Sequence, residues 1–169
     1  MEKVAFLDRD GVINVNIGKH CYVNSWDQFI FIAGAVEGIK RLNRAGYKVV
    51  IVTNQSGIAQ NLMTVEQLEE VHKYLRMVVK NAGGHIDQIY YCPHARTEEC
   101  SCRKPKIGMF LQAEKLYDMD KSSSFMLGDS SSDMEAAKNY GIAGYLFKDQ
   151  DNLVTFIENI LAERCGDVR

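Results

Sequence analysis

Residues 4–11 read VAFLDRDG, a short apolar run that leads directly into two carboxylates and a glycine. An apolar run of this length, bounded by a turn signal, is typical of a strand buried on both faces, as in parallel sheets. We therefore expect a buried strand over residues 4–7, with a polar turn at its carboxyl end.

Four further apolar runs of the same kind follow along the chain. They occupy residues 49–52, 86–91, 125–127 and 142–147. Apolar residues at helical spacing lie between and after the runs, at residues 36–42, 68–79, 108–117, 131–140 and 153–161. Because helical segments separate successive strands, the strands need crossover connections and pair in parallel. The expected fold is a doubly wound α/β fold whose mainly parallel sheet is covered on both faces.

Two helices carry signals for their ends. Thr64, followed three residues later by Gln67, forms a capping box, in which each side chain satisfies a backbone donor at the other residue. Gly46 and Gly83 follow two of the helical patterns and offer a conformation that ends many helices. The helix over residues 68–79 is therefore expected to begin at Thr64 and to stop before Gly83.

The composition is that of a globular domain. The chain has 169 residues, of which 46% are hydrophobic and 25% charged, and its net charge is -2. This length supports one core, so residues 1–169 are expected to form a single domain. No apolar stretch approaches the roughly 20 residues of a membrane span, and no long basic run favours nucleic acid or an anionic membrane. We expect a small-molecule partner and, by default, a monomer.

The N-terminus and the cysteines predict a cytoplasmic location. Only the short apolar run of residues 4–7 precedes Asp8, which is too little for a signal peptide. The five cysteines are an odd number, and three of them crowd one loop, which in a reducing compartment indicates metal ligands rather than disulfides. Cys21 and Cys165 are then expected to be free thiols.

Polar residues follow each expected strand. In a doubly wound sheet the ligand crevice lies beyond the carboxyl ends of the strands. The sequence there is DRDG at residues 8–11, TNQSG at residues 53–57, a cysteine loop at residues 92–102 and GDSSSD at residues 128–133. Carboxylates, hydroxyls and glycines are therefore expected to converge on one edge of the sheet.

Three carboxylates at this edge predict a cation site. Asp8 and Asp10, joined by Asp129 from another strand, would repel one another strongly in one crevice unless a cation neutralised them. A site of oxygen ligands suits Mg²⁺, which binds few protein carboxylates alongside a substrate phosphate. A single Asp after a strand is more often a turn or a helix cap. Three Asp residues at the ends of strands favour a metal site over turns or helix caps.

Neighbouring residues offer contacts for phosphate. Thr53 and Asn54 supply hydroxyl and amide donors, and the Ser56-Gly57 backbone can approach an anion closely, although such residues also make ordinary turns. The sequence RKPK at residues 103–106 places cations on the expected crevice side, where one can contact the transferred phosphoryl group. The expected substrate-binding residues are Asn54, Gln55, Ser56 and Arg103.

These motifs together resemble the haloacid dehalogenase superfamily of phosphotransferases. The matching residues are DRDGV at residues 8–12, the Thr53-Asn54 pair, Lys104, and Gly128-Asp129 with Asp133. Their order and spacing agree over nearly the whole chain. The resemblance implies that Asp8 attacks phosphorus to form an aspartyl-phosphate, while Asp10 protonates the leaving oxygen and then activates water.

The same resemblance implies the metal ligands. Mg²⁺ would be held by Asp8, the backbone carbonyl of Asp10 and Asp129, with Asp133 supporting from nearby. Thr53 and Lys104 would stabilise phosphoryl charge. Superfamily members often carry a cap domain, but here the expected strands and helices already fill the intervals between the motifs. We therefore expect no cap domain, so that the loop at residues 14–31 and the cysteine loop select the substrate.

The cysteine loop predicts a structural zinc site. Its potential ligands are Cys92, His94, Cys100 and Cys102, enough for a closed tetrahedral site, although the one-residue gaps are narrower than usual. The alternative is a loop of reduced thiols. Zinc here would fix the short segment that leads into Arg103 and Lys104. The other histidines do not belong to such a cluster of cysteines in the sequence and are expected to be ordinary surface or packed residues. They are His20, His72 and His85.

Two related families within the superfamily share this cysteine pattern: the heptose bisphosphate phosphatases and the phosphatase domain of bacterial histidinol-phosphatase. The stretch TNQSGIA at residues 53–59 and Gly108-Met109 are similar to the heptose enzymes, which implies hydrolysis of the phosphate at carbon 7 of heptose 1,7-bisphosphate. The five-residue gap between His94 and Cys100 is similar to the histidinol enzymes.

The chain also departs from both patterns. Ser130 stands where both families tend to have a basic residue, and Gln60-Asn61 replaces the Arg-Gly of the heptose enzymes. A third hypothesis is a catalytically silent module that binds a phosphosugar or a protein. The clustered charge of the motifs speaks against it, because a silent relative has no need of such costly groups.

Overall fold

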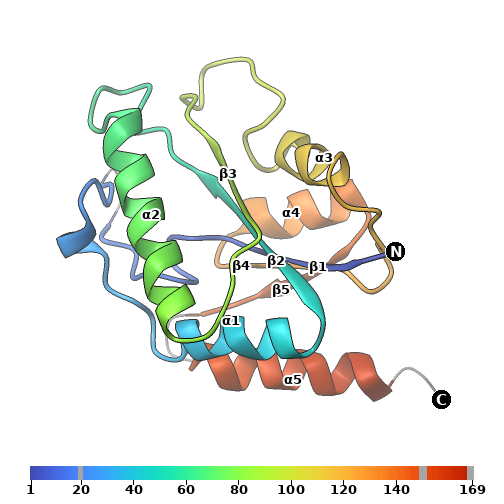
Figure 1. Ribbon diagram of the computed structural model, residues 1–169. Helices are drawn as coiled ribbons and strands as arrows, with labels where there is room; N and C mark the ends of the chain where they lie inside the picture. Colours follow the sequence, from blue (N-terminus) through green and yellow to red (C-terminus); the bar gives the residue numbers. More distant parts are fainter. Residues whose placement is uncertain (19–20, 149–151, 167–169) are drawn as a thin grey trace.

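The computed structural model describes residues 1–18, 21–148 and 152–166, and it contains a five-stranded sheet (Figure 1). The strands lie in the order β3-β2-β1-β4-β5, and every neighbouring pair is parallel. Their bounds are β1 Lys3–Leu7, β2 Tyr47–Asn54, β3 Gln88–Cys92, β4 Phe125–Gly128 and β5 Ala143–Leu146. The first strand, β1, lies at the centre of the sheet, β2 and β3 follow on one side of it, and β4 and β5 lie on the other side. This order confirms the predicted doubly wound fold.

Helices cover both faces of this sheet, as predicted. On one face pack α1 (Ala35–Arg44), α2 (Val65–Asn81) and α5 (Leu153–Gly166), and on the other pack α3 (Gly108–Glu114) and α4 (Ser131–Tyr140). Successive side chains of a strand point to opposite faces. Leu7 of β1 therefore joins the first helical layer, while Phe6 joins the second.

An aromatic cluster fixes the second layer to the central strand. The ring centroids of Phe6 and Phe110 lie 4.6 Å apart, and those of Phe110 and Tyr140 lie 5.0 Å apart. All three side chains are buried. The cluster thus joins β1, α3 and α4 through one continuous apolar contact.

The predicted helix ends are mostly confirmed. The Thr64 hydroxyl accepts from the Gln67 backbone N–H at 3.2 Å, and the Gln67 side chain accepts from the Thr64 N–H at 2.9 Å, which is the predicted capping box. The helix over residues 108–117 ends earlier, at Glu114, in a turn where the three following N–H groups share the Ala113 carbonyl. The last helix runs beyond Leu161, because the residues that follow include strong helix formers.

The segments between the motifs contain no cap domain within the described residues. From β1 to β2 the chain forms only a short 3₁₀ helix, η1 (Trp26–Gln28), and α1, while from β2 to Lys104 it forms α2 and β3. None of the described helices is both long enough and apolar enough to cross a membrane. His20 and the Cys165 side chain lie outside the described residues.

Candidate active site

The strand ends meet at one edge of the sheet. Leu7 at the end of β1 lies beside Ile51 of β2 and Leu127 of β4 in the parallel register. The next residues on each strand, Asp8 and Gly128 among them, therefore come to the same level. The sheet register alone thus brings together the turns that carry the predicted motifs.

Three carboxylates gather at this edge. Asp8, Asp129 and Asp133 each offer an oxygen, and these oxygens lie within 4.8 Å of one another. Asp129 comes from the turn after β4, and Asp133 from the first turn of α4. The Asp133 carboxylate also accepts from the Ser130 backbone N–H at 3.1 Å and from the Ser130 hydroxyl at 2.6 Å. Ser130 serves as the N-cap of α4.

Lys104 lies against this group. Its Nζ is 3.0 Å from Asp8 Oδ1 and 2.7 Å from Asp133 Oδ1, and it donates to the Val52 carbonyl at 2.7 Å. The side chain is only 3% exposed. Burial works to lower the pKa of Lys104, but the charges of Asp8 and Asp133 outweigh it and raise that pKa. The ammonium is therefore a fixed positive charge beside Asp8.

One ammonium does not balance three carboxylates. Burial, together with the charges of Asp133, Asp129 and Asp10, raises the pKa of Asp8 to about 7, although Lys104 acts to lower it. Burial and the charge of Asp133 likewise raise the pKa of Asp129 to about 6. Burial is the larger cause of both rises and repulsion between the carboxylates adds to it, so a bound cation would lower both pKa values. The oxygen donors and this deficit fit a hard divalent cation such as Mg²⁺.

Gly11 is required for this arrangement. Its φ is +86°, a conformation that side chains rarely adopt. A Cβ at this position would also collide with the Asp129 carboxylate. The glycine of the first motif therefore lets the turn after β1 approach the turn after β4.

The Asp10 side chain points elsewhere. Its carboxylate is not part of the three-carboxylate group, where Asp133 takes the position that the sequence assigned to Asp10. It accepts instead from Arg9, Asn14 and Gln55. Burial acts to raise the pKa of Asp10, but the Arg9 charge and these hydrogen bonds lower it. These contacts fix the orientation of the Asp10 side chain.

Two of the predicted substrate-binding side chains contact residues of the predicted catalytic set. The Asn54 amide donates to the Lys104 carbonyl at 3.2 Å, and its oxygen accepts from the Lys104 N–H at 3.0 Å. Gln55 is fully buried and donates to Asp10 at 2.7 Å and to the Thr53 hydroxyl at 2.9 Å. Both side chains therefore hold residues of the predicted catalytic set in place.

The other two contact protein groups outside the predicted catalytic set. Ser56 is 8% exposed, and its hydroxyl lies 2.9 Å from the Tyr22 hydroxyl, which comes from the loop at residues 14–31. The Tyr22 ring lies so close to Gly57 that a Cβ there would sit 2.7 Å from ring atoms. Arg103 donates to the His94 carbonyl at 3.2 Å. The two loops expected to select the substrate thus both reach this edge.

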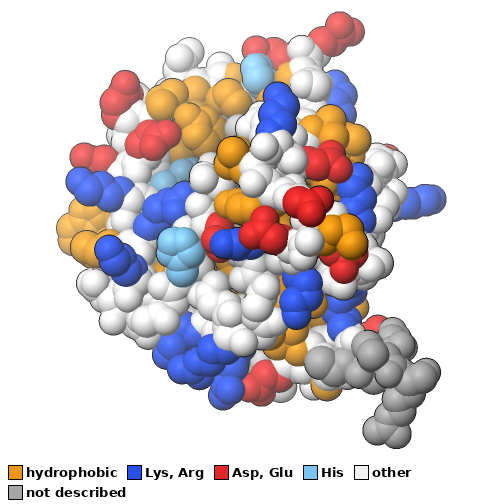
Figure 2. Space-filling model, turned by 45° about the vertical axis from the view of Figure 1, so that its right-hand side comes forward, with side chains coloured by type: hydrophobic (Ala, Val, Ile, Leu, Met, Phe, Trp, Pro, Cys, Tyr) orange, Lys and Arg blue, Asp and Glu red, His pale blue; other side chains and the backbone are white. Residues whose placement is uncertain are grey.

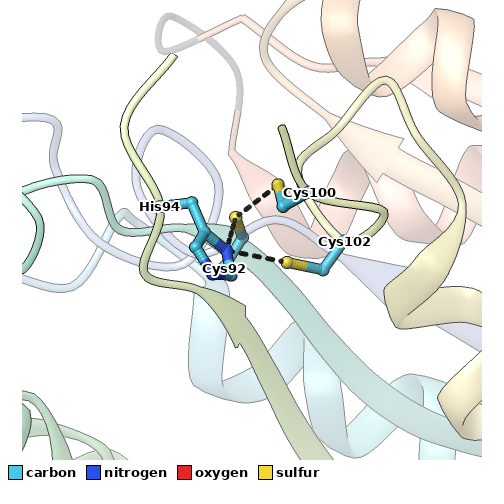
Figure 3. A group of neighbouring side chains, drawn as sticks. All are labelled: Cys92, His94, Cys100 and Cys102. Atoms are coloured by element: carbon cyan, nitrogen blue, oxygen red, sulfur yellow. Dashed lines mark hydrogen bonds between the residues drawn. The ribbon is translucent and has the colours of Figure 1, made fainter. Parts of the chain in front are cut away.

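The four predicted ligands of the cysteine loop point toward one another (Figure 3). Cys92 Sγ lies 3.8 Å from Cys100 Sγ and 3.5 Å from His94 Nδ1, and His94 Nδ1 lies 3.3 Å from Cys102 Sγ. Tetrahedral zinc with bonds of about 2.3 Å to sulfur and about 2.0–2.1 Å to nitrogen places its ligands about 3.8 Å and about 3.5 Å apart. The cluster therefore fits a four-coordinate metal ion.

Sequence reasoning missed the neighbours of Asp10. Arg9 is fully buried, and its Nη1 lies 3.2 Å from Nε2 of His72 on α2. His72 lies one residue after Val71 on the buried face of α2, so its burial could have been read from the helical spacing. The side chain of His85, by contrast, is exposed, as expected of an ordinary surface residue. Cys21 is an exposed free thiol, as predicted.

Comparison with known proteins places these features in a family. The family model described as polynucleotide kinase 3 phosphatase matches residues 3–156. A D-glycero-beta-D-manno-heptose-1,7-bisphosphate 7-phosphatase of Pasteurella multocida is 43% identical over 82% of this chain and 77% of that protein. The protein of the same name from Rhodopseudomonas palustris is 39% identical over 94% of this chain and 90% of that protein.

Solved structures agree with these sequence matches. The D,D-heptose 1,7-bisphosphate phosphatase from B. bronchiseptica, complexed with magnesium and phosphate, superposes with a TM-score of 0.86 and 32% identity. The match covers 95% of this chain and 99% of that one. The corresponding enzyme from Burkholderia thailandensis has a TM-score of 0.68 and 28% identity, with 95% and 99% of the two chains covered.

Proposed function

This chain belongs to the polynucleotide kinase 3 phosphatase family of haloacid dehalogenase-type phosphatases, and from that premise we propose that it is a magnesium-dependent heptose bisphosphate phosphatase. The proposed reaction is hydrolysis of the phosphate at carbon 7 of D-glycero-β-D-manno-heptose 1,7-bisphosphate, the substrate in the names of its relatives. The observation that carries the proposal is the surroundings of Asp8. A buried ammonium lies 3.0 Å from its carboxylate, within a carboxylate group able to share one cation.

In the proposed mechanism Asp8 is the nucleophile. A carboxylate oxygen of Asp8 bonds to phosphorus as the bond between phosphorus and the sugar oxygen breaks, and that oxygen takes its proton from Asp10. Water then attacks the aspartyl-phosphate and gives a proton to Asp10, which releases inorganic phosphate and restores Asp8. Lys104 and Thr53 would stabilise the charge on the phosphoryl oxygens.

Magnesium, when bound, would offset the charge of the carboxylates and of the phosphate. Its proposed ligands are Asp8, Asp129 and the backbone carbonyl of Asp10, with Asp133 in support. Ser56 and Arg103 remain proposed substrate contacts. The side chains of Asn54 and Gln55 contact Lys104 and Asp10, and their proposed role is to position these two residues.

The cysteine loop is proposed to hold structural zinc. Three separations between the ligand atoms match those of a closed tetrahedral zinc site, and four protein ligands leave no position for substrate. The ion would therefore fix the loop that carries Arg103 to the site. Equimolar zinc in the purified protein supports this proposal, and a zinc-free protein with an unchanged loop would remove it.

A small substrate is favoured over a nucleic acid end. The net charge is -2, and acidic and basic side chains are interspersed over the face in Figure 2 rather than forming one basic surface. Electrostatic attraction of a polynucleotide needs clustered Lys and Arg. The second candidate is histidinol phosphate, which the short gap between His94 and Cys100 favours.

Phosphate release in the presence of Mg²⁺ distinguishes these substrates. We expect heptose 1,7-bisphosphate to be hydrolysed with a kcat/KM at least about tenfold above that for histidinol phosphate or for a 3′-phosphorylated oligonucleotide, because pocket contacts of one group are worth about that much. More efficient hydrolysis of either alternative would overturn the assignment. Asp8→Asn should abolish turnover while leaving the circular dichroism spectrum unchanged, and activity in that variant would exclude Asp8 as the nucleophile.

A further inference from the structure

Asp10 is held by three donors of the protein itself. Arg9 Nη2 donates to both carboxylate oxygens, at 3.0 Å and 3.1 Å. Asn14 Nδ2 donates at 2.8 Å and Gln55 Nε2 at 2.7 Å. The orientation of this carboxylate relative to Asp8 therefore depends on where these donors are fixed.

The strongest of them, Arg9, has a charge that is fully buried. Within residues 1–18, 21–148 and 152–166, Asp10 is the only carboxylate that forms an ion pair with Arg9. A buried guanidinium cannot lose its proton and keeps its hydrogen-bonding groups in one plane. Of its other two nitrogens, Nε has no hydrogen-bond partner among the described residues, so the contact at Nη1 sets its orientation.

His72 makes the contact on the far side of the guanidinium. Because a guanidinium has donors only, Arg9 Nη1 donates the 3.2 Å bond and His72 Nε2 accepts it. His72 is 5% exposed on α2, and its ring lies 6.0 Å from that of Tyr91 on β3. Burial and the charges of Arg9 and Arg76, opposed by Asp10, lower the pKa of His72 to about 3. The ring is thus a neutral acceptor at ordinary pH.

We propose that His72 is a positioning residue for the phosphatase reaction: by accepting from Arg9, it fixes the guanidinium that orients the Asp10 carboxylate toward the leaving oxygen. The inference rests on the proposed function in one respect, the acid and base role of Asp10. It adds a residue of α2, an element with no other assigned part in the chemistry. In this proposal His72 acts only through Arg9.

The test compares two leaving groups. The sugar alkoxide of an alkyl phosphate needs a proton from Asp10, whereas p-nitrophenolate leaves without one, and kcat/KM reports the steps up to this cleavage. In His72→Leu we expect kcat/KM for heptose 1,7-bisphosphate to fall about tenfold, part of the roughly 10²–10⁴-fold that general acid catalysis contributes. The value for p-nitrophenyl phosphate should stay within about twofold, and so should KM for both substrates.

Matched variants separate positioning from packing. In His72→Gln the amide oxygen can replace Nε2 as acceptor, so the activity on the alkyl phosphate should return. His72→Asn carries the same amide but is too short, and should behave like His72→Leu; this pair decides the question even if His72→Leu does not fold. Leu75→Val, on the same buried face of α2, should lower the melting temperature without changing the ratio between the two substrates.

Two outcomes would overturn the inference. One is an unchanged ratio between the two substrates in His72→Asn and His72→Leu. The other is a ¹⁵N spectrum in which the His72 ring titrates near neutral pH, because a protonated ring cannot accept from Arg9. If wild-type protein does not hydrolyse the heptose substrate, the proposed function fails, and the comparison is made with any alkyl phosphate that it does hydrolyse.

Discussion

Asp8 illustrates how a single residue depends on charges that the protein alone does not balance. Burial raises the pKa of Asp8 to about 7, and the charges of the neighbouring carboxylates add to this rise against the opposing charge of Lys104. A nucleophilic carboxylate must be ionised to attack phosphorus. The metal ion and the substrate charge therefore govern when Asp8 is in its reactive form.

This charge deficit predicts the pH dependence of stability in metal-free protein. The pKa of Asp8 is raised from 3.8 to about 7, so the folded state binds this proton more tightly than the unfolded state. The stabilisation is complete below about pH 4 and is lost as the pH rises through about 7. Relative to Asp8→Asn, metal-free wild-type protein should become less stable over this range, as measured by urea unfolding.

Mg²⁺ provides the control for that measurement. Because protonated carboxyls are poor metal ligands, added Mg²⁺ should stabilise wild-type protein more at about pH 8 than at about pH 5. A wild-type protein whose stability relative to Asp8→Asn does not change with pH would show that the carboxylates are not short of charge.

At the residue scale, the sequence predicted which residues form the site better than it predicted which side chains they contact. Asp8, Asp129 and Lys104 are brought together as expected, since the register of a parallel sheet brings strand ends to one level. The direction of the Asp10 side chain was not predicted, because it depends on Gln55, which is 45 positions away in the sequence. The contact between Arg9 and His72, 63 positions apart, was missed for the same reason.

Among the elements, α2 begins with a capping box that the sequence already indicates. Both hydrogen bonds of the Thr64 and Gln67 capping box are present. Thr64→Ala should lower the free energy of unfolding by about 1 kcal/mol, within the range of about 0.5–2 kcal/mol for lost N-caps. Thr64→Ser keeps the hydroxyl and should remain within a few tenths of a kcal/mol of wild type. Equal losses in the two variants would show that the hydroxyl bond contributes nothing.

The cysteine loop should respond to metal removal as one element. Its ligands come from both ends of the loop, Cys92 and His94 on one side and Cys100 and Cys102 on the other (Figure 3). Chelation should speed hydrogen exchange at residues 93–103 by about tenfold or more, as expected when metal binding is coupled to local folding. Residues of α5, on the opposite face, serve as the internal control and should exchange at an unchanged rate.

Element ends were predicted where a side chain marks them. The start of α2 has such a marker, and the predicted range of α4 is also the observed one. The ends of α3 and α5 lack one, and periodicity of apolar residues does not fix the last turn of a helix. The second role of Asp133, which holds Ser130 as well as Lys104, was likewise not readable from the pattern.

For the molecule as a whole, the aromatic cluster at Phe6, Phe110 and Tyr140 tests whether the chain unfolds as the single domain predicted for residues 1–169. Phe110 is fully buried, so Phe110→Ala should cost about 3–5 kcal/mol. Leu111→Ala, at the next position of α3, changes a side chain that is 42% exposed and should cost about 0.5 kcal/mol or less. Fluorescence and circular dichroism should give the same unfolding midpoint in both variants; separate midpoints would indicate two units.

The fold class was predictable because its signals are redundant. Five apolar runs alternate with helical patterns, so a shifted boundary in α3 leaves the topology unchanged. For the site, the sequence predicted which strand ends meet, but not the side-chain contacts that form there. The choice of substrate depends on the loop at residues 14–31 and on the cysteine loop, whose conformations follow from contacts such as that of Tyr22 with Ser56 rather than from periodicity.

The paired contacts between Asn54 and Lys104 have a practical consequence for experiments. The amide of Asn54 holds the main chain of Lys104, while the ammonium of Lys104 has separate partners. Removing the side chain in Lys104→Gly or Lys104→Ala should therefore leave the main chain docked and open a space of known shape beside Asp8. A small alkylammonium ion added to the solution can enter such a space and replace the ammonium of Lys104. The experimenter can then vary the concentration and the size of this cation.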